Sequence, residues 1–219
     1  MKPLASVIVG LGIVLSLAGA ASAGPIAHLT LQSQPGDFIG QGQNWDITYT
    51  PSNSTFFSAQ ITHTLPSGAP TYLSFLLGTV TGDSSNTFST LDFSTQQLGI
   101  ALAPGTYLDA QRAAFATAGH PGLDVTFQNR GSNTLTGQFT VNDVSFVTTG
   151  SGLQIESFDV SFEQHSEGQT PALFGQFSYS AGDYVIPEPA SLSLCGAGIA
   201  CVAGFALRRW KGRPASAAA

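Results

Sequence analysis

Acidic and imidazole side chains gather at the end of one alternating run in the second half of the chain. Asp159, Glu163 and His165 share one phase of the run, and Glu167 follows it directly. Residues in one phase of a strand share a face, so these groups are the first candidates for acid–base or metal chemistry. Four residues of strand separate Asp159 from Glu163 by roughly 13 Å, beyond the widest spacing of about 9.5 Å in inverting glycosidases. An acid–base pair would therefore need a carboxylate from another strand.

The same carboxylates could instead hold a hard cation. Asp37, Asp143, Glu163 and Glu167 are expected at loops or bulges, where carboxylate and backbone oxygens can surround an ion. Asp37 or Asp143 could equally supply the second carboxylate of an acid–base pair. No EF-hand loop accompanies them. We predict no resident cofactor, with calcium as the candidate ion if the four converge and solvated surface charge if they do not.

Sequence motifs of nucleophilic catalysis and phosphate binding are absent. The chain has no Gly-x-Ser-x-Gly elbow, no Gly-rich phosphate loop and no Cys/His metal spacing. Both cysteines, Cys195 and Cys201, fall in a C-terminal apolar segment, so the domain before it has no disulfide. We predict no catalytic residues and a protein that is not an enzyme, with a glycan-acting hydrolase as the enzymatic alternative.

Aromatic side chains offer another kind of site. The domain has more rings than one small core must contain, and rings on a sheet face can stack on sugars. Most of these rings are expected in the core. Trp45 and Tyr72 are the candidates for glycan stacking, since indole and phenol keep a polar edge that can stay in water.

Short alternating runs, broken by Gly, Pro, Asn or Asp, must position all these groups. Apolar residues mostly recur at every second position, which is typical of strands. Ten runs are predicted: 26–32, 44–50, 55–64, 71–77, 87–94, 106–115, 123–128, 134–148, 153–164 and 172–180. They favour an all-β domain, an antiparallel β-sandwich or a jelly-roll-like fold.

The last three runs predict an antiparallel meander. A phase change at residues 142–143 predicts a bulge, a second change is expected between 155 and 158, and residues 149–152 supply the turn. The core positions of the middle run should be Phe158, Val160 and Phe162.

The N-terminus has the features of an export signal. Lys2 precedes an apolar region, and Ala21-Ser22-Ala23 follows with the small-x-small pattern of a signal-peptidase site. We expect a signal peptide over residues 1–23, cleaved by signal peptidase after Ala23. An uncleaved N-terminal anchor is the alternative.

A second apolar segment lies near the C-terminus. Residues 190–207 carry no charge and would span roughly 27 Å as a helix, which predicts one transmembrane helix. A basic cluster over 208–213 follows, before a tail over 214–219: Arg208, Arg209, Lys211 and Arg213. Basic residues favour the cytoplasmic side, so the C-terminus is expected there and the preceding domain outside.

Pro187, Glu188 and Pro189 stand directly before that segment. Together with the apolar helix, the basic cluster and the export signal, they resemble the bacterial PEP-CTERM sorting signal, here assigned to residues 184–213. The resemblance implies processing by an exosortase near the motif, followed by release or attachment at the cell surface. It also implies an envelope or matrix component of Gram-negative bacteria that make exopolysaccharide.

Blocks within the domain resemble a group of exported bacterial β-domains of unknown function. The blocks are Pro35-Gly-Asp-Phe-Ile-Gly40, Gly105-Thr-Tyr107, Arg112-Ala-Ala-Phe115, Asn133-Thr-Leu-Thr-Gly137, Phe162-Glu-Gln-His-Ser-Glu-Gly168 and Pro171-Ala-Leu-Phe-Gly175. In that group cysteines stand at the positions of Ser132 and Ser166, and the resemblance implies that they bridge neighbouring strands. The group has no established activity that could be transferred.

Length and charge narrow the function classes. Residues 24–183 suit one domain. Between residues 24 and 186 there are twelve acidic residues and only two basic ones, Arg112 and Arg130, which gives a net charge of −10. Such a surface repels phosphate backbones, so we predict no nucleic-acid partner, whereas cations and neutral sugars remain candidates.

Together these features predict an exported protein that is first a single-pass membrane intermediate and then a cell-surface or extracellular-matrix component. Its β-domain is expected to be a non-catalytic structural or adhesive module linked to exopolysaccharide or biofilm. The alternatives are a carbohydrate-binding module and a glycan-acting hydrolase. The expected partners are signal peptidase, an exosortase-like enzyme and an exopolysaccharide.

Overall fold

The computed structural model describes residues 24–82 and 87–182, which form ten strands and two short 3₁₀ helices. The strands are β1 (Ile26–Ser33), β2 (Asn44–Tyr49), β3 (Phe57–Thr64), β4 (Pro70–Gly78), β5 (Phe88–Ser94), β6 (Gly105–Arg112), β7 (Gly122–Thr126), β8 (Leu135–Thr149), β9 (Gly152–Ser166) and β10 (Ala172–Ser180). The 3₁₀ helices are η1 (Gln96–Leu98) and η2 (Ala113–Phe115). All ten predicted strands are confirmed. The largest difference at an end is in β6, which stops at Arg112 because the chain turns into η2.

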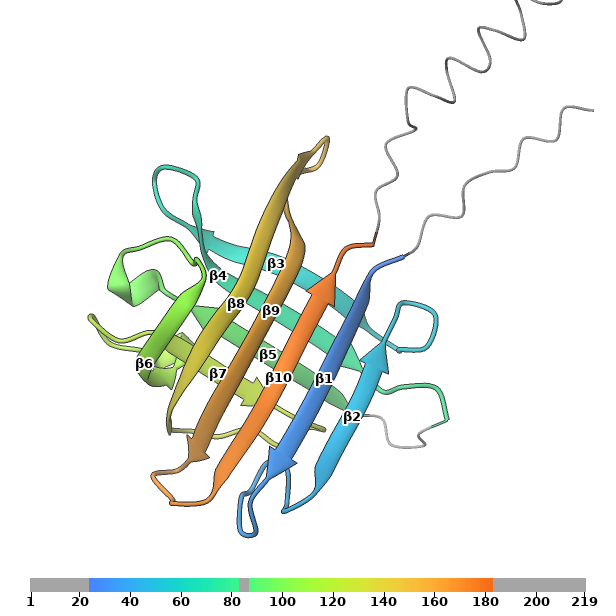
Figure 1. Cartoon of the computed structure of the whole chain (residues 1–219), viewed down its shortest axis with the longest axis vertical. Helices are drawn as coiled ribbons and strands as arrows, with labels where there is room; N and C mark the ends of the chain where they lie inside the picture. The colour runs from blue at the N-terminus through green and yellow to red at the C-terminus, as the bar shows by residue number, and fades with distance from the viewer. Residues whose placement is uncertain (1–23, 83–86, 183–219) are drawn as a thin grey trace, which may run out of the picture. The chain divides into compact units, whose positions relative to one another are not determined.

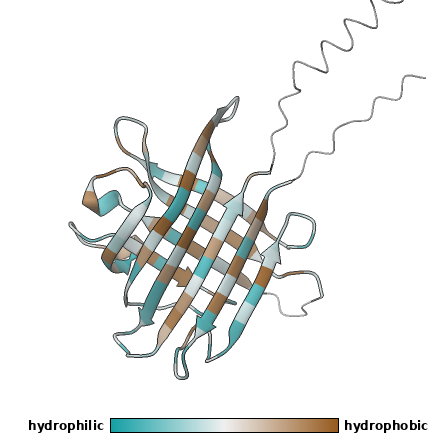
Figure 2. Ribbon diagram, viewed as in Figure 1, coloured by the Kyte–Doolittle hydropathy of each residue, from teal (hydrophilic) through white to brown (hydrophobic). Residues whose placement is uncertain are grey.

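Alternation along each strand decides which face is buried. Phe158, Val160 and Phe162 of β9 are buried, as predicted, while Asp159 and Glu163 between and after them are only partly covered. Figure 2 shows the same alternation of hydrophobic and hydrophilic residues along the neighbouring strands. Strand β9 therefore contributes one face to the core and leaves polar side chains on the other.

All ten strands belong to one mixed sheet, in the order β2-β1-β10-β9-β8-β6-β7-β5-β4-β3. Neighbouring strands are antiparallel except β6 and β7, which are parallel. The sheet folds over at that pair, so that β3, β4, β5 and β7 cross behind the other strands at a steep angle (Figure 1).

The prediction of a β-sandwich or jelly roll is thus corrected in its finer part. The all-β class is confirmed, but the two layers are parts of a single, nearly closed sheet rather than two separate antiparallel sheets. Both arrangements bury one face of every strand, so the alternation in the sequence is the same for either.

Aromatic side chains from both layers fill the space between them. Phe75 of β4 is 0% exposed, and its ring centroid lies 5.5 Å from Phe158 and 4.7 Å from Phe177. Phe93 of β5, equally buried, contacts Phe139 and Phe158 at 5.4 Å. Tilted and edge contacts of this kind add about 0.5–1.5 kcal/mol each to the burial of the rings. The core therefore joins the back layer to β8, β9 and β10.

Two bulges bend the β8–β9 hairpin where they were predicted. Asn142 is the extra residue on β8, and Glu156 is the extra residue on β9. A bulge inserts one residue into one strand and increases the local bend and twist. The phase changes in the sequence therefore correspond to real register shifts.

The positions at which the resemblance implied paired cysteines are adjacent in the structure. Ser132 Oγ donates a hydrogen bond to Ser166 Oγ at 2.6 Å, and both side chains are buried. This contact ties the segment before β8 to the last residue of β9.

Gln164 connects the two layers at the fold-over. Strands β6 and β7 share only two residue pairs, so most of that side of β7 lacks a strand partner. At Val125, the buried side chain of Gln164 from β9 takes the place of a strand partner. Its carboxamide oxygen accepts from Val125 N at 2.9 Å, and its Nε2 donates to Val125 O at 3.1 Å.

We expect Gln164→Leu to lower the free energy of unfolding by about 2–4 kcal/mol, because it leaves the Val125 N–H and C=O groups buried without partners. Gln176→Leu, on the exposed face of β10, is the matched control and should change it by less than about 0.5 kcal/mol. Urea unfolding followed by tryptophan fluorescence measures both. Equal losses in the two variants would contradict a connecting role for Gln164.

Candidate functional site

The structure places two of the four predicted cation ligands in separate local networks. Asp37 is 4% exposed in the β1–β2 connection and accepts hydrogen bonds from Ser33 Oγ at 2.7 Å and Gly40 N at 2.8 Å. Asp143, at the bulge of β8, accepts from Ser157 Oγ at 2.6 Å. Asp37 therefore shapes a turn, and Asp143 supports the β8–β9 ladder.

Glu163 and Glu167 are likewise held by their neighbours. Glu163 lies 2.9 Å from His165 Nε2 and accepts from Gln138 Nε2 at 2.8 Å, and the bond with His165, followed by that with Gln138, lowers the pKa of Glu163. The backbone N–H of Asn133 binds Glu167 and lowers the pKa of that carboxyl. In residues 24–82 and 87–182, no three His, Cys, Asp or Glu side chains form a group that could hold a metal ion, so the four carboxylates do not converge.

The two aromatic candidates differ in their surroundings. The ring of Trp45 packs against Phe127 at a centroid distance of 5.2 Å, on the edge of the core. Its indole N–H is buried and has no partner among the described residues. Tyr72 lies on the outer face of β4, half-buried, and stacks on the ring of His63 at 5.6 Å. Tyr72 is therefore the candidate that faces a cavity.

That cavity is an open groove of about 510 Å³ over the outer face of β3, β4 and β5. Tyr72 and Ser74 come from β4, and Asp92 comes from β5. The rest of the lining is Thr62, His63, Gln96, Gln97, Ala113 and Ala114, so the two 3₁₀ helices contribute to it. A ring, hydroxyls, amides and one carboxyl thus share a single surface.

Asp92 has a second carboxylate directly beside it. In the β5–β7 register Asp92 pairs with Asp124, and directly opposite Cβ atoms lie about 4.5–5.5 Å apart. Burial raises the pKa of Asp92 to about 6; the hydrogen bond with Ser74 opposes this rise, and the charge of Asp124 adds to it. Asp92 therefore holds its proton closer to neutral pH than an ordinary carboxyl does.

Asp124 is more deeply placed, with 8% of its surface exposed. Its Oδ2 accepts from Arg112 Nε at 2.8 Å, whereas its Oδ1 is buried and has no partner in the described part of the chain. Burial raises the pKa of Asp124, and Arg112 offsets part of the rise. Burial, followed by the charges of Asp92 and Asp124, also raises the pKa of the Tyr72 hydroxyl.

Sequence reasoning missed Asp92 and Asp124, although a signal was present. Each stands alone in an apolar run, as Leu91-Asp92-Phe93 and Leu123-Asp124-Val125. In an alternating run, a residue between two apolar core positions lies on the face opposite the core. Only the pairing of β5 with β7 brings the two together.

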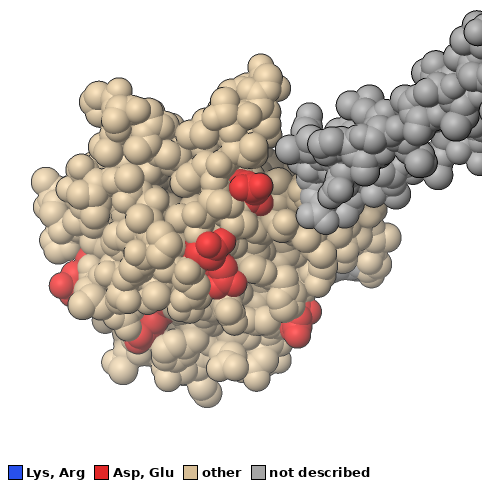
Figure 3. Space-filling model, turned by 45° about the horizontal axis from the view of Figure 1, so that its top comes forward, with Lys and Arg blue, Asp and Glu red and all other residues tan. Residues whose placement is uncertain are grey.

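Both arginines of the domain are already engaged. Arg112 bonds Asp124 and lies with its guanidinium 5.0 Å from the centre of the Phe115 ring. Arg130 Nε donates to the backbone oxygen of Ile39 at 2.7 Å. On the face in Figure 3, acidic side chains lie as separate spots and no basic side chain is seen. An anionic ligand would meet no uncommitted arginine in the described domain.

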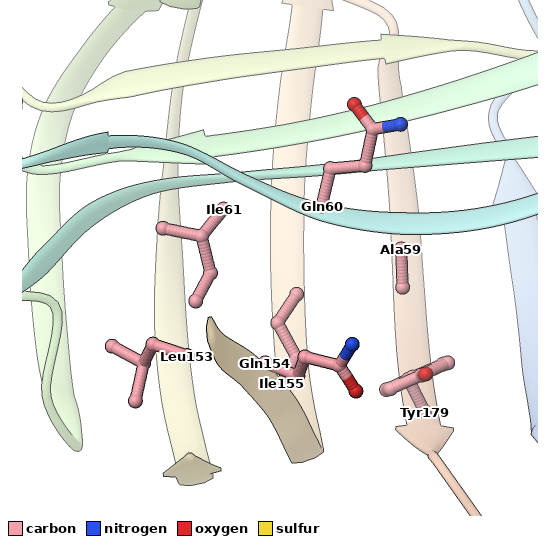
Figure 4. Close-up of a pocket in the computed structure, with 7 residues that line it drawn as sticks. All are labelled: Ala59, Gln60, Ile61, Leu153, Gln154, Ile155 and Tyr179. Atoms are coloured by element: carbon pink, nitrogen blue, oxygen red, sulfur yellow. The ribbon is translucent and has the colours of Figure 1, made fainter. Parts of the chain in front are cut away.

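A second gap, of about 330 Å³, lies where β3 passes the start of β9. Four of its seven lining residues are apolar (Ala59, Ile61, Leu153 and Ile155), and Figure 4 shows the Gln60 side chain turned away from the other lining residues. Strand β3 is the last in the sheet order and pairs only with β4, so this gap marks the open edge of the sheet. Its lining includes no carboxyl or imidazole group.

The predicted signal peptide (1–23), sorting signal (184–213) and tail (214–219) lie outside the described residues. Within the described ranges, no helix has the length and apolar character needed to cross a membrane. Nothing matches the chain among the protein-family models, curated proteins and solved structures with which it was compared.

Asp92→Asn should make the domain more stable at neutral pH. The folded state holds the proton of the Asp92 carboxyl up to about pH 6, whereas the unfolded chain releases it near 3.8. The contribution of the protonated carboxyl to folding stability is therefore complete below pH 3.8 and is lost as pH rises through 6. Asn resembles the protonated carboxyl at every pH. The variant should match the wild type near pH 4 and exceed it by up to about 3 kcal/mol near pH 7.

Urea unfolding across this pH range provides the measurement. Asp109→Asn is the matched control, since Asp109 is exposed and its φ of +55° is one that Asn tolerates. A stability difference for Asp92→Asn that stays constant with pH would show that Asp92 is an ordinary surface carboxylate.

Proposed function

We propose that this chain is an exported cell-surface or extracellular-matrix protein whose β-domain adheres to a non-anionic polysaccharide. The observation that carries the proposal is the open groove in which the Tyr72 ring stands beside hydroxyl, amide and carboxyl side chains. A structural or adhesive role in a polysaccharide matrix needs such a contact surface and no bond-breaking chemistry.

The chemistry of the groove suits a sugar chain. Aromatic rings stack on the C–H face of a pyranose, and an amphipathic ring such as tyrosine keeps its hydroxyl in water. Ser74, Gln96 and Gln97 add donors and acceptors for sugar hydroxyls. Because the groove is open along the sheet surface, it can accept a segment of a longer chain.

Charge favours a neutral or positively charged polymer over an anionic one. Between residues 24 and 186 the net charge is −10, and both arginines already bind groups of the protein itself. An acidic polysaccharide would be repelled without a compensating contact.

A glycan-acting hydrolase has weaker support from the same groove. Asp92 lines it, and its raised pKa of about 6 is closer to the operating pH that suits a general acid than that of an ordinary carboxyl. The neighbouring Asp124 is outside the lining, with one oxygen bonded to Arg112 and the other buried. It is poorly placed to attack or activate water at a bound sugar.

The export part of the proposal rests on the sequence of the two ends. The signal peptide, Pro187-Glu188-Pro189, the apolar segment 190–207 and the basic cluster form one ordered series. In the proposal, the segment holds the domain outside the membrane until an exosortase-like enzyme cleaves near the motif.

We expect that replacing Pro187 and Pro189 by Ala blocks this processing. In a bacterium that carries an exosortase, a C-terminal epitope tag should be lost from the wild type and kept by the variant, which stays in the membrane fraction. Pro214→Ala, in the tail, is the control and should be processed like the wild type. Immunoblots of membrane and medium fractions decide, and tag loss from the double variant would refute the sorting role.

We expect Tyr72→Ala to weaken polysaccharide binding about two- to tenfold, because loss of a stacking ring removes roughly 0.5–1.5 kcal/mol of contact energy. Tyr72→Phe keeps the ring and should stay within about threefold of the wild type. Phe38→Ala, which removes a 54% exposed ring outside the groove, is the control. Titration calorimetry on the full-length protein in detergent micelles measures all three, and equal affinities for Tyr72→Ala and wild type would remove the groove from the proposal.

A further inference from the structure

We propose that the groove selects sugar units that carry a free, protonated amino group, with Asp92 and the Tyr72 ring as the recognition elements. The inference rests on the proposed function, because it names the ligand class of the same groove. The ligand would be a polymer of amino sugars in which some amines are not acetylated.

The first support is the Asp92–Asp124 pair, in which Arg112 is bonded to Asp124 alone. Asp92 and Asp124 are directly opposite on β5 and β7, and Arg112 satisfies only one oxygen of Asp124. The other oxygen of Asp124 is buried and unpartnered among the described residues. A cation placed at Asp92 would stabilise its ionised form against burial and the charge of Asp124, which both raise the pKa of Asp92.

The second support is the aromatic wall of the groove. Tyr72 lines the same groove as Asp92, and an ammonium near a ring face gains about 0.5–2 kcal/mol from the ring quadrupole. Ser74 and Thr62 add hydroxyl oxygens as further acceptors. An ammonium group has three donors, so a carboxylate, a hydroxyl and a ring suit it together.

A metal ion is a poorer fit to the same groups. Calcium takes six to eight oxygen ligands, and magnesium needs near-octahedral geometry. The described residues contain no group of three metal-ligating side chains, and Asp124 is partly committed to Arg112. An organic ammonium needs fewer acceptors than either metal ion and can bind on an open surface.

Other charged groups around Asp92 do not reverse this preference. Asp124 adds negative charge from β7, and Arg112 lies behind Asp124, bonded to it. His63 stacks on Tyr72 at the groove wall and would oppose a cation only when protonated. Preference for the amine should therefore be strongest above about pH 6, where Asp92 is ionised, and below the pKa of the sugar amine, where that amine is still protonated.

The test compares two hexasaccharides that share a backbone, one of glucosamine and one of N-acetylglucosamine, titrated into the full-length protein in detergent micelles. At neutral pH we expect the free-amine hexamer to bind at least tenfold more tightly. The preference should shrink toward one on acidification to about pH 5, as Asp92 takes up a proton.

Two variants of equal charge separate the groove from general attraction to an acidic domain. Asp92→Asn should reduce the amine preference to about onefold, while Asp109→Asn, an exposed carboxyl outside the groove lining, should keep it. An equal reduction in both variants would overturn the inference, because general electrostatics would then explain the binding.

The remaining outcomes distinguish the two proposals. Equal affinity for both hexamers overturns amine selection and leaves sugar adhesion standing. Binding of neither hexamer, with uncharged polysaccharides also failing, overturns the proposed function and the inference together. Circular dichroism of each variant confirms that loss of binding is not loss of fold.

Discussion

The fold-over between β6 and β7 is the constraint on which the rest of the structure depends. A sheet that turns back on itself after two residue pairs leaves backbone donors and acceptors of β7 without a strand partner. Unpaired buried backbone groups cost about 1–3 kcal/mol each, so the turn must supply replacements. Gln164 supplies them from the core side, and the Arg112–Asp124 ion pair joins β6 to β7 from the outer side. Side-chain contacts therefore stabilise the β6–β7 junction on its core side and on its outer side.

This junction also explains why the polar groove lies where it does. Burying Phe75 and Phe93 toward β8, β9 and β10 turns the alternate residues of β4 and β5 outward. Tyr72, Ser74 and Asp92 then form one outer surface, and η2 covers its edge because β6 ends early at Arg112. Asp124, which stabilises the junction, consequently lies beside Asp92, and its charge adds to the burial that raises the pKa of Asp92. Fold stability and the proposed ligand binding therefore depend on neighbouring side chains.

Most other carboxylates of the domain serve local structure. Asp37 closes the β1–β2 turn, and Glu167 holds the segment before β8 through the backbone of Asn133. Each satisfies nearby N–H groups, which is the ordinary use of an acidic residue at a turn. A carboxyl at a loop or bulge is therefore weak evidence for a metal site. A carboxyl isolated in an apolar strand, as at Asp92 and Asp124, is the more informative pattern.

The sequence by itself determined the ten strands, the β8 and β9 bulges and the buried face of β9, because alternation and turn residues are local properties. It could not determine that one sheet forms both layers, since a sandwich and a folded sheet require the same alternation. Nor could the sequence show that Asp92 pairs with Asp124, 32 residues away, or that Gln164 forms hydrogen bonds with Val125, 39 residues away. Such contacts depend on strand register and on the space left where the sheet folds over, and only the tertiary structure fixes both.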